Sequence, residues 1–314
     1  MTTTWSIVIT TYSRPAMLKR AIESCIAQTH PCEIVVVDDC SSDDTASVAG
    51  QFPQIVYIRN PTNLGHSRTA NIGMERAGGT WIKHLDDDDF LHPDCLQRMN
   101  AVIADAQARG HDPKIASCIS VNVDLDRTPL SRTKMLPVEK PVLIPRRDVA
   151  RIMMIDQAPF GTPVQVAHER EAGLRVGGWN ETRPIRFQNG DEAEFWVRVA
   201  PQGDAIFIPE PLAYRTLWSG NENPSHLERL HISRYLKARV HEQMAGLPPD
   251  TTASAPADIL RYLDLHWGLV ALKDGNFSTA LRLLPRGMFH PKSYDLIRRR
   301  RRFADAMQCA VVLN

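Results

Sequence analysis

The chain carries the stretch Trp81-Ile82-Lys83-His84-Leu85-Asp86-Asp87-Asp88-Asp89-Phe90, in which a short apolar run meets four successive carboxylates. The apolar run is typical of a buried strand. Four carboxylates this close repel one another and raise one another's pKa unless a cation neutralises them. Hard oxygen ligands suit Mg²⁺ or Mn²⁺, so the cluster predicts a divalent-metal site, and through the ion a phosphate site. A solvated acidic turn before a helix at Pro93 is the alternative interpretation.

Strand and helix patterns alternate over the first hundred residues. Strands are expected at 5–11, 33–37, 55–58 and 80–85, and helices from Pro15, from Asp43, over 66–77 and over 93–108. Such alternation implies right-handed βαβ units and a mainly parallel sheet. Ligands of such sheets bind beyond the carboxyl ends of the strands, where residues 10–12, 38–39 and 86–89 are all expected. The pattern therefore predicts a nucleotide-type pocket.

Composition narrows the class of protein. The chain has 314 residues and a formal net charge of +1, so no global field recruits nucleic acid. Six cysteines without a C-x-x-C pair favour reduced thiols in a cytosolic protein. The N-terminus lacks the features of a signal peptide, and no apolar segment approaches the roughly 20 residues of a membrane span. We expect a cytoplasmic protein that does not bind nucleic acid.

Seven segments, taken in order, resemble family 2 glycosyltransferases with a GT-A fold. They are residues 7–15, 35–45, 63–73, 85–89, 177–181, 191–198 and 208–215. The resemblance implies an α/β, Rossmann-like, mainly parallel sheet flanked by helices, with a small helical C-terminal extension. It implies a catalytic domain over 1–245, with a nucleotide-sugar half at 1–110 and an acceptor half at 111–245, followed by the extension at 255–314.

The resemblance also implies a reaction. An inverting, metal-dependent enzyme would move a sugar from a UDP-, GDP- or dTDP-linked donor to a hydroxyl acceptor in glycan, polysaccharide or glycoconjugate synthesis, with Mn²⁺ or Mg²⁺ as cofactor. A nucleotidyltransferase is disfavoured, because residues 11–15 contain no glycine for a phosphate-binding loop. A catalytically silent nucleotide-sugar-binding or scaffold protein is the remaining alternative.

Donor and metal residues follow from the matched motifs. The resemblance assigns Thr10, Tyr12 and Arg14 to the wall around the donor nucleotide, Asp38 or Asp39 to the base or ribose, and Arg68 to the diphosphate. It assigns Asp86, Asp87 and Asp88 to the donor and metal. Asp86 and Asp88 form the D-x-D pair, with Asp88 as the direct metal ligand. Two alternatives stay open: a polar turn at 38–42 and a helix-surface charge at Arg68.

The general base is expected where Asp191-Glu192 matches the family's Glu-Asp pair in reversed order. By position Glu192 is the base that takes the acceptor's proton, and by residue type it is Asp191. We favour Glu192. In the same motif Phe195 and Trp196 are expected in the core, and Arg198 in an ion pair.

The acceptor side is expected at the loop 177–181. There Gly178 permits close backbone approach and Trp179 either stacks on a sugar or packs in the core. Two departures from the family are present. Ala70-Asn71 replaces its Arg-Asn pair, and the His expected soon after Tyr214-Arg215 is absent before His226, which could be a ligand or a structural residue.

The remaining chain is less informative. Residues 125–165 are Pro-rich and are expected to be irregular with short strands around the acceptor. A linker is expected at 247–256, then one tetratricopeptide-like helix–turn–helix over 259–284 that packs on the catalytic domain or a second subunit of a homodimer. The run Arg298–Arg302 is interpreted either as a peripheral contact with an anionic membrane, useful for a lipid-linked acceptor, or as a solvated or internally paired helix.

Overall fold

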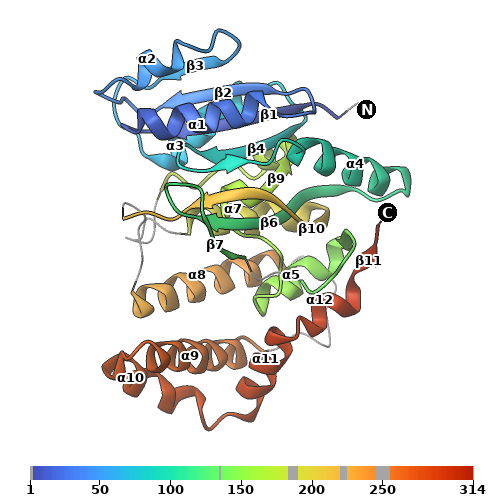
Figure 1. Ribbon diagram of the computed structural model, residues 1–314. Helices are drawn as coiled ribbons and strands as arrows, with labels where there is room; N and C mark the ends of the chain where they lie inside the picture. The colour runs from blue at the N-terminus through green and yellow to red at the C-terminus, as the bar shows by residue number, and fades with distance from the viewer. Residues whose placement is uncertain (1–2, 134–135, 183–189, 220–224, 245–254, 314) are drawn as a thin grey trace.

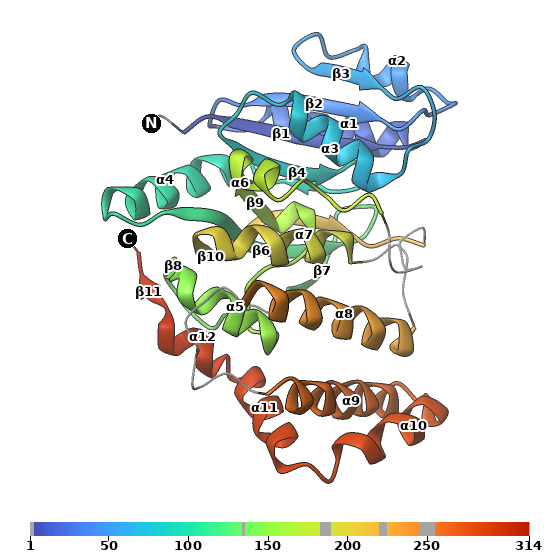
Figure 2. The same cartoon turned by 180° about the vertical axis from the view of Figure 1, so that it is seen from behind.

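The computed structural model describes residues 3–133, 136–182, 190–219, 225–244 and 255–313. One sheet crosses the molecule in the order β11-β8-β10-β6-β9-β4-β1-β2-β3, with helices on both of its faces (Figures 1 and 2). Strand β5 pairs with β10 and β7 with β6 outside this path. The expected α/β class with a mainly parallel sheet is confirmed.

The first four strands of the central sheet are parallel and closely follow the sequence pattern. They are β1 (Trp5–Thr11), β2 (Glu33–Asp38), β3 (Val56–Arg59) and β4 (Trp81–Asp86), and they alternate with α1 (Pro15–Ile26), α2 (Thr45–Ala49) and α3 (His66–Arg76). In register, Thr10 lies opposite Asp86 and Thr11 opposite Asp38. The polar residues that end these strands therefore meet at one edge, as the pattern predicts.

The second half of the sheet is mixed. After β5 (Phe90–Leu91), α4 (Cys95–Ala108) leads into β6 (Pro113–Val123), and β9 (Val166–Glu169) runs antiparallel between β4 and β6. The strand β10 (Asp204–Thr216) lies parallel to β6, with register shifts between Ile208 and Ala213. Short elements complete this half: β7 (Pro129–Arg132), β8 (Val142–Ile144), α6 (Arg170–Arg175) and α7 (Asp191–Val199).

One expectation for this half is wrong. Residues 125–165 contain short strands, but they also form a regular helix, α5 (Arg146–Met154). Pro145 precedes its first residue, where a missing N–H costs no helical hydrogen bond. The five buried residues Val149, Ala150, Ile152, Met153 and Met154 face the core. Pro145, one of the prolines that suggested irregular chain, therefore marks the start of a helix.

Two apolar cores lie on opposite faces of the sheet. On one face, Ile7 and Ile9 of β1 pack with buried residues of α1 and α4, including Ile22 and Met99. On the other face, Val8 belongs to the cluster that holds residues of α3, α5, α7 and α8. Alternate residues of a strand point to opposite faces, so the continuous apolar run of β1 serves both cores.

The C-terminal helices pack on the rest of the molecule through α8 (His226–Met244), which lies against α5 and α7. The predicted helix–turn–helix is confirmed as α9 (Pro256–Lys273) and α10 (Phe277–Gly287), and α11 (Pro291–Arg301) and α12 (Ala304–Cys309) follow. The chain then returns to the sheet, where β11 (Val311–Val312) pairs with β8. Most of the predicted linker lies outside the described residues, and Pro256 is the first residue of α9.

Polar contacts join the tail to the rest of the molecule. The carboxylate of Asp156, which follows α5, accepts hydrogen bonds from the Lys237 ammonium of α8 and, at 2.9 Å, from the Tyr262 hydroxyl of α9. The guanidinium of Arg234 bonds Asp264 at 2.6 Å. None of the helices in the described part of the chain combines the length and apolar character that crossing a bilayer requires.

Candidate active site

Strand ends place four aspartates beside the first strand. The hydroxyl of Thr11 donates to Asp87 at 2.6 Å, and the hydroxyl of Thr10 lies 3.4 Å from Asp86. A backbone bond from the Asp87 N–H to the Thr10 carbonyl, 3.2 Å long, holds the turn that follows β4. The predicted meeting of the 10–12 and 86–89 segments is therefore present.

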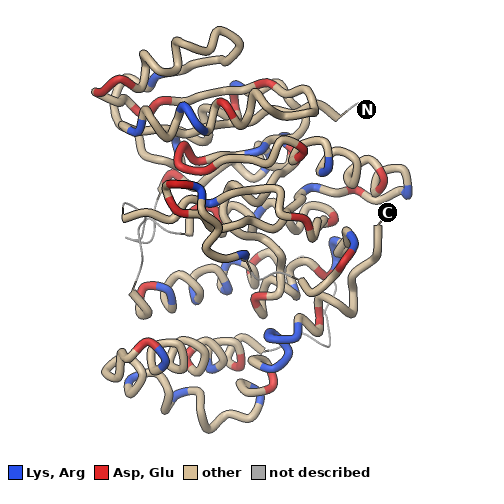
Figure 3. The backbone as a smooth tube through the Cα atoms, in the orientation of Figure 1, with Lys and Arg blue, Asp and Glu red and all other residues tan. Residues whose placement is uncertain are grey.

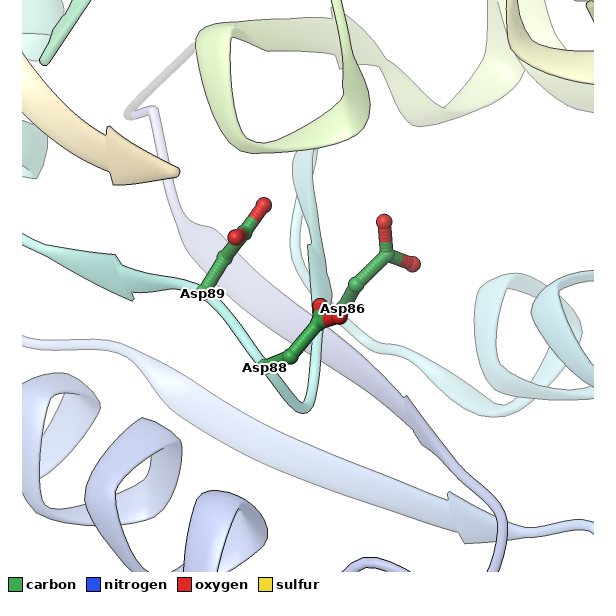
Figure 4. A group of neighbouring side chains, drawn as sticks. All are labelled: Asp86, Asp88 and Asp89. Atoms are coloured by element: carbon green, nitrogen blue, oxygen red, sulfur yellow. The ribbon is translucent and has the colours of Figure 1, made fainter. Parts of the chain in front are cut away.

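The acidic turn itself brings carboxylate oxygens together. One oxygen from each of Asp86, Asp88 and Asp89 lies within 4.8 Å of the others, and Figure 4 shows the three side chains leaving the same turn between β4 and β5. Burial raises the pKa of Asp88 and Asp89, and their neighbouring carboxylates raise it further. Burial also raises the pKa of Asp87, to about 7. The cluster is thus built from hard oxygen donors whose ionised forms need a cation.

Two arginines of the first helical segment supply part of that positive charge. Arg14 bonds Asp87 at 2.8 Å and Asp88 at 3.2 Å. Arg20 donates to the backbone carbonyl of Asp88 and, at 2.7 Å, to the Thr216 hydroxyl. Arg14 therefore lies at the acidic cluster as well as near the expected nucleotide wall, where Tyr12 is 49% exposed. No spacing in the sequence singles out Arg20.

The end of β10 closes the cluster from the opposite side. The backbone N–H of Thr216 donates to Asp89 at 2.9 Å, and the indole N–H of Trp218 donates to Asp88 at 3.0 Å. Trp218 stands in the segment where the family's histidine was expected, and sequence reasoning missed it. His226 bonds Asp274 of the tail at 2.9 Å, which gives it a structural partner there.

The start of α3 connects the acidic turn to α7. His66 is the first residue of α3, and its Nε2 lies 3.2 Å from Asp86. Burial would lower the pKa of His66, but the hydrogen bond and charge of Asp86 outweigh it and raise the pKa. The next residue, Ser67, donates to Asp191 at 2.8 Å. Sequence reasoning missed both side chains, because their partners are 20 and 124 residues away.

The two candidate bases begin α7. Burial raises the pKa of Glu192, which also lies within the electrostatic reach of His66 and Asp86. A raised pKa suits a carboxylate that must take a proton near neutral pH. Further along α7, Arg198 forms an ion pair with Glu194, with a shortest N–O distance of 2.6 Å. Phe195 and Trp196 of the same helix are buried. The expected ion pair and core packing of this helix are therefore present.

The two aspartates that are predicted to contact the nucleotide form hydrogen bonds with nearby parts of the chain. Asp38 is fully buried and accepts from the Ser41 hydroxyl and, at 2.6 Å, from the Tyr57 hydroxyl. Asp39 accepts from the backbone N–H groups of Leu64 and Gly65, both at 2.8 Å. These bonds match the polar-turn interpretation and fix the loops that follow β2 and β3. A contact with base or ribose remains a prediction.

Asn71 of α3 holds the glycine loop in place. Its amide donates to the Trp179 carbonyl at 2.9 Å and accepts from the Trp179 N–H at 2.7 Å. At Gly178, where φ is +71°, a Cβ would lie 2.3 Å from the Asn71 oxygen. Glycine is therefore needed for this approach, and a contact of Gly178 with the acceptor remains a prediction.

Two further expectations change here. The Trp179 ring is only 1% exposed and stacks with Phe195, at 5.1 Å between ring centroids, so it packs in the core rather than offering a face to a sugar. Arg68 pairs with Glu75 and Glu181 at 3.2 and 3.3 Å on the surface of α3, as the alternative interpretation stated. Its contact with a diphosphate stays a prediction.

A pocket of about 370 Å³ opens beside this loop. Its wall is formed by residues 176–182 together with Glu194, Arg198 and Arg239. Polar side chains and backbone dominate this wall, which suits a hydroxylated ligand. The pocket shares α7 with the candidate bases.

Comparison with known proteins places this arrangement in a family. The sequence pattern described as Glycosyl transferase family 2 matches residues 6–153, which include β1 to β4 and the acidic turn. Residues 6–153 belong to glycosyltransferase family 2. The chain is 26% identical to an uncharacterised glycosyltransferase of Haemophilus influenzae over 67% of each chain. It is 36% identical to the succinoglycan biosynthesis protein ExoO of Rhizobium meliloti, over 38% of this chain and 34% of ExoO.

Solved structures share the fold. S. aureus TarS 1–349 in complex with UDP-GlcNAc superimposes with a TM-score of 0.65 and 16% identity, covering 90% of this chain and 78% of that one. The mannosyltransferase PcManGT from Pyrobaculum calidifontis, in complex with GDP-Man and Mn²⁺, gives 0.54 and 18% over 98% and 87%. These likenesses confirm the GT-A fold.

Proposed function

We propose that this glycosyltransferase moves a sugar from a nucleoside-diphosphate donor to a hydroxyl acceptor, with inversion, in the synthesis of a polysaccharide or glycoconjugate. One observation carries the proposal: the first two residues of α3 connect the acidic turn to the start of α7, since His66 contacts Asp86 and Ser67 contacts Asp191, one of the two candidate bases. A leaving-group site and a base site are thus neighbours. The nucleotide sugars bound by TarS and PcManGT support a donor of this class.

The donor half of the site offers a place for a divalent ion. Asp88, with Asp86 and Asp89, presents clustered carboxylate oxygens. Burial raises the pKa of Asp88 and Asp89, so a bound cation would stabilise their ionised forms. Mn²⁺ or Mg²⁺ fits this oxygen donor set, and the bound ion would stabilise negative charge on the departing diphosphate. The Mn²⁺ in the PcManGT complex supports such an ion.

The chain's own residues orient the donor. Arg14 forms ion pairs with Asp87 and Asp88, and the Thr11 hydroxyl joins Asp87 to β1. Trp218 and Thr216 fix Asp88 and Asp89 from the other side, so the carboxylates are held before substrate arrives. Such preorganisation reduces the cost of orienting groups during the reaction. Tyr12 is exposed at the same edge and is placed to line the nucleotide.

The acceptor half supplies the base. In the proposed step Glu192 takes the acceptor's hydroxyl proton while the oxygen attacks the anomeric carbon from the face opposite the diphosphate, which gives inversion. Asp191 is held by Ser67 and would position α7 or serve as the alternative base. We place the acceptor at the pocket beside Gly178, next to the same helix.

The direct test measures nucleoside diphosphate released from UDP-, GDP- and dTDP-sugars, with Mn²⁺, with Mg²⁺ and with a chelator. The proposal expects metal-dependent release that rises when hydroxyl acceptors are added, and loss of release in Asp88→Asn. Glu171→Gln, an exposed acid on α6, is the matched control. Tight donor binding without turnover across varied acceptors would instead support a silent binding protein.

A further inference from the structure

The outer side of α10 carries an apolar stripe that the fold leaves uncovered. Phe277, Leu281 and the C-cap residue Met288 are 64%, 75% and 40% exposed, and their spacings of four and seven residues place them on one helix face. Phe289, just after α10, is 83% exposed. The opposite face of α10 buries Ala280, Leu283 and Gly287, so the helix has a second apolar face beyond the one that the fold uses.

The Lys, Arg, Asp and Glu residues of the segment 275–294 are all cationic, and the nearest acids in sequence, Asp274 and Asp295, lie directly outside it. Residues 275–294 contain no Asp or Glu, whereas Arg282, Arg286 and Lys292 lie within them. All three cations belong to exposed residues, and Lys292 also reaches Asp258 of α9 at 2.9 Å. Exposed apolar side chains with flanking cations match an anionic lipid surface.

The same charge argues against a second copy of the chain as the occupant. A twofold contact through α10 would bring the stripe of one copy against the same stripe of the other. Arg282 and Arg286 would then approach their own counterparts without an acid from residues 275–294 to separate them. Like charges facing each other across an interface oppose association.

The arginine run contributes less than its composition suggests. Arg299 is bound to Asp305, and Arg300 lies 2.8 Å from a ring nitrogen of His266. Arg298 is exposed but pairs with Asp295 at 2.7 Å. The run appears in Figure 3 as a blue segment at the end of α11, and much of it faces partners within its own molecule.

We propose that residues 275–294, centred on α10, form a peripheral binding surface for anionic phospholipid bilayers, with Phe277, Leu281 and Phe289 entering the headgroup region and Arg282 and Arg286 meeting lipid phosphates. This surface is separate from the acidic turn, so lipid binding does not depend on the proposed transfer reaction. Figures 1 and 2 show that α8 and α9 lie between the sheet and α10.

Vesicle co-sedimentation of the full chain tests the proposal. Vesicles contain phosphatidylcholine alone, or equal parts phosphatidylcholine and phosphatidylglycerol. We expect binding to the anionic vesicles only. Replacing Phe277, Leu281 and Phe289 together by Ser should weaken it by about tenfold or more, and Arg282→Glu/Arg286→Glu should do the same with reduced salt dependence.

Matched controls separate this surface from general effects. Ile26→Ser/Val312→Ser removes exposed apolar side chains elsewhere, and Arg298→Glu/Arg301→Glu makes the same change in net charge outside the surface. Both should bind vesicles nearly as the unaltered chain does, and circular dichroism should show all variants folded. Lack of vesicle binding by the unaltered chain, equal loss in the controls, or a Leu281-dependent dimer without vesicle binding would overturn the proposal.

Discussion

At the scale of single residues, the proposed chemistry depends on which of the two acids at the start of α7 acts as the base. Glu192 has the raised pKa that burial causes, whereas Asp191 is held by the Ser67 hydroxyl at 2.8 Å. We predict that Glu192→Gln lowers kcat by about a thousandfold while nucleoside diphosphate binding is retained, and that Asp191→Asn has a smaller effect. Steady-state kinetics and donor titration check this. A larger loss in Asp191→Asn would reverse the assignment.

Gly178 gives a second residue-scale prediction. Its φ of +71° and the 2.3 Å approach of Asn71 to a built Cβ both oppose a side chain. We expect Gly178→Ala to lower the free energy of unfolding by about 3 kcal/mol. The adjacent Gly177 has a φ of +81° but open space around its Cβ position, so Gly177→Ala should cost only about 1 kcal/mol. Equal losses in denaturant unfolding would show that the Asn71 contact does not matter.

At the scale of elements, the buried pair His84 on β4 and His168 on β9 makes stability depend on pH. Their Nε2 atoms are 3.2 Å apart, and burial lowers the pKa of His168 to about 4 and that of His84 well below its usual value. In the unfolded chain these histidines take up a proton near pH 6.5, whereas in the folded chain they stay neutral to a lower pH. The free energy of unfolding is therefore highest above pH 6.5 and falls as the pH falls toward 4. For His168 alone the loss is about 3 kcal/mol.

Thermal melting from pH 7 to pH 4 tests this linkage. We expect the melting temperature to fall over that interval and to fall less steeply in His168→Gln, which keeps a polar side chain but cannot take up the proton. An unchanged slope in this variant would contradict the assignment to His168.

Elements with a strong local pattern were predictable from sequence, and long-range partners were not. The run Trp5–Thr11 is predicted and observed over the same residues, because its apolar continuity is local. Helix α5 was missed, since Pro145 was interpreted as a breaker although it lies directly before the helix. Trp218 reaches Asp88 across 130 residues, and only the fold of β10 beside β5 and β6 brings them together.

The acidic turn was predictable in part: its position was, and the partners of its side chains were not. Its place at a strand end follows from the alternating pattern, and that place is confirmed by the register of Thr10 with Asp86. The side-chain roles needed the structure: Asp87 bonds Thr11 while Asp88 receives Arg14 and Trp218. Trp179 illustrates the same limit, because only the packing of α7 decides whether its ring meets core or solvent.

At the scale of the whole molecule, the tail is bound to the catalytic part through Asp156. Burial would raise the pKa of Asp156, but Lys237 and Arg300 outweigh it and lower the pKa. We predict that Asp156→Asn destabilises the chain by about 2 kcal/mol and speeds limited proteolysis of the tail helices. Asp295→Asn, at a more exposed pair with Arg298, is the control and should change neither. Unchanged proteolysis in Asp156→Asn would show that other contacts hold the tail.

The account as a whole rests on the acidic turn holding a cation that binds a diphosphate. Isothermal titration of UDP and GDP into the chain, with and without Mn²⁺, measures this most directly when the unaltered chain and Asp88→Asn are compared. We predict that at least one of the two nucleotides binds, that its binding strengthens by about tenfold or more with Mn²⁺, and that Asp88→Asn removes this gain. Nucleotide binding of equal affinity with and without Mn²⁺, and in the variant, would contradict the central claim.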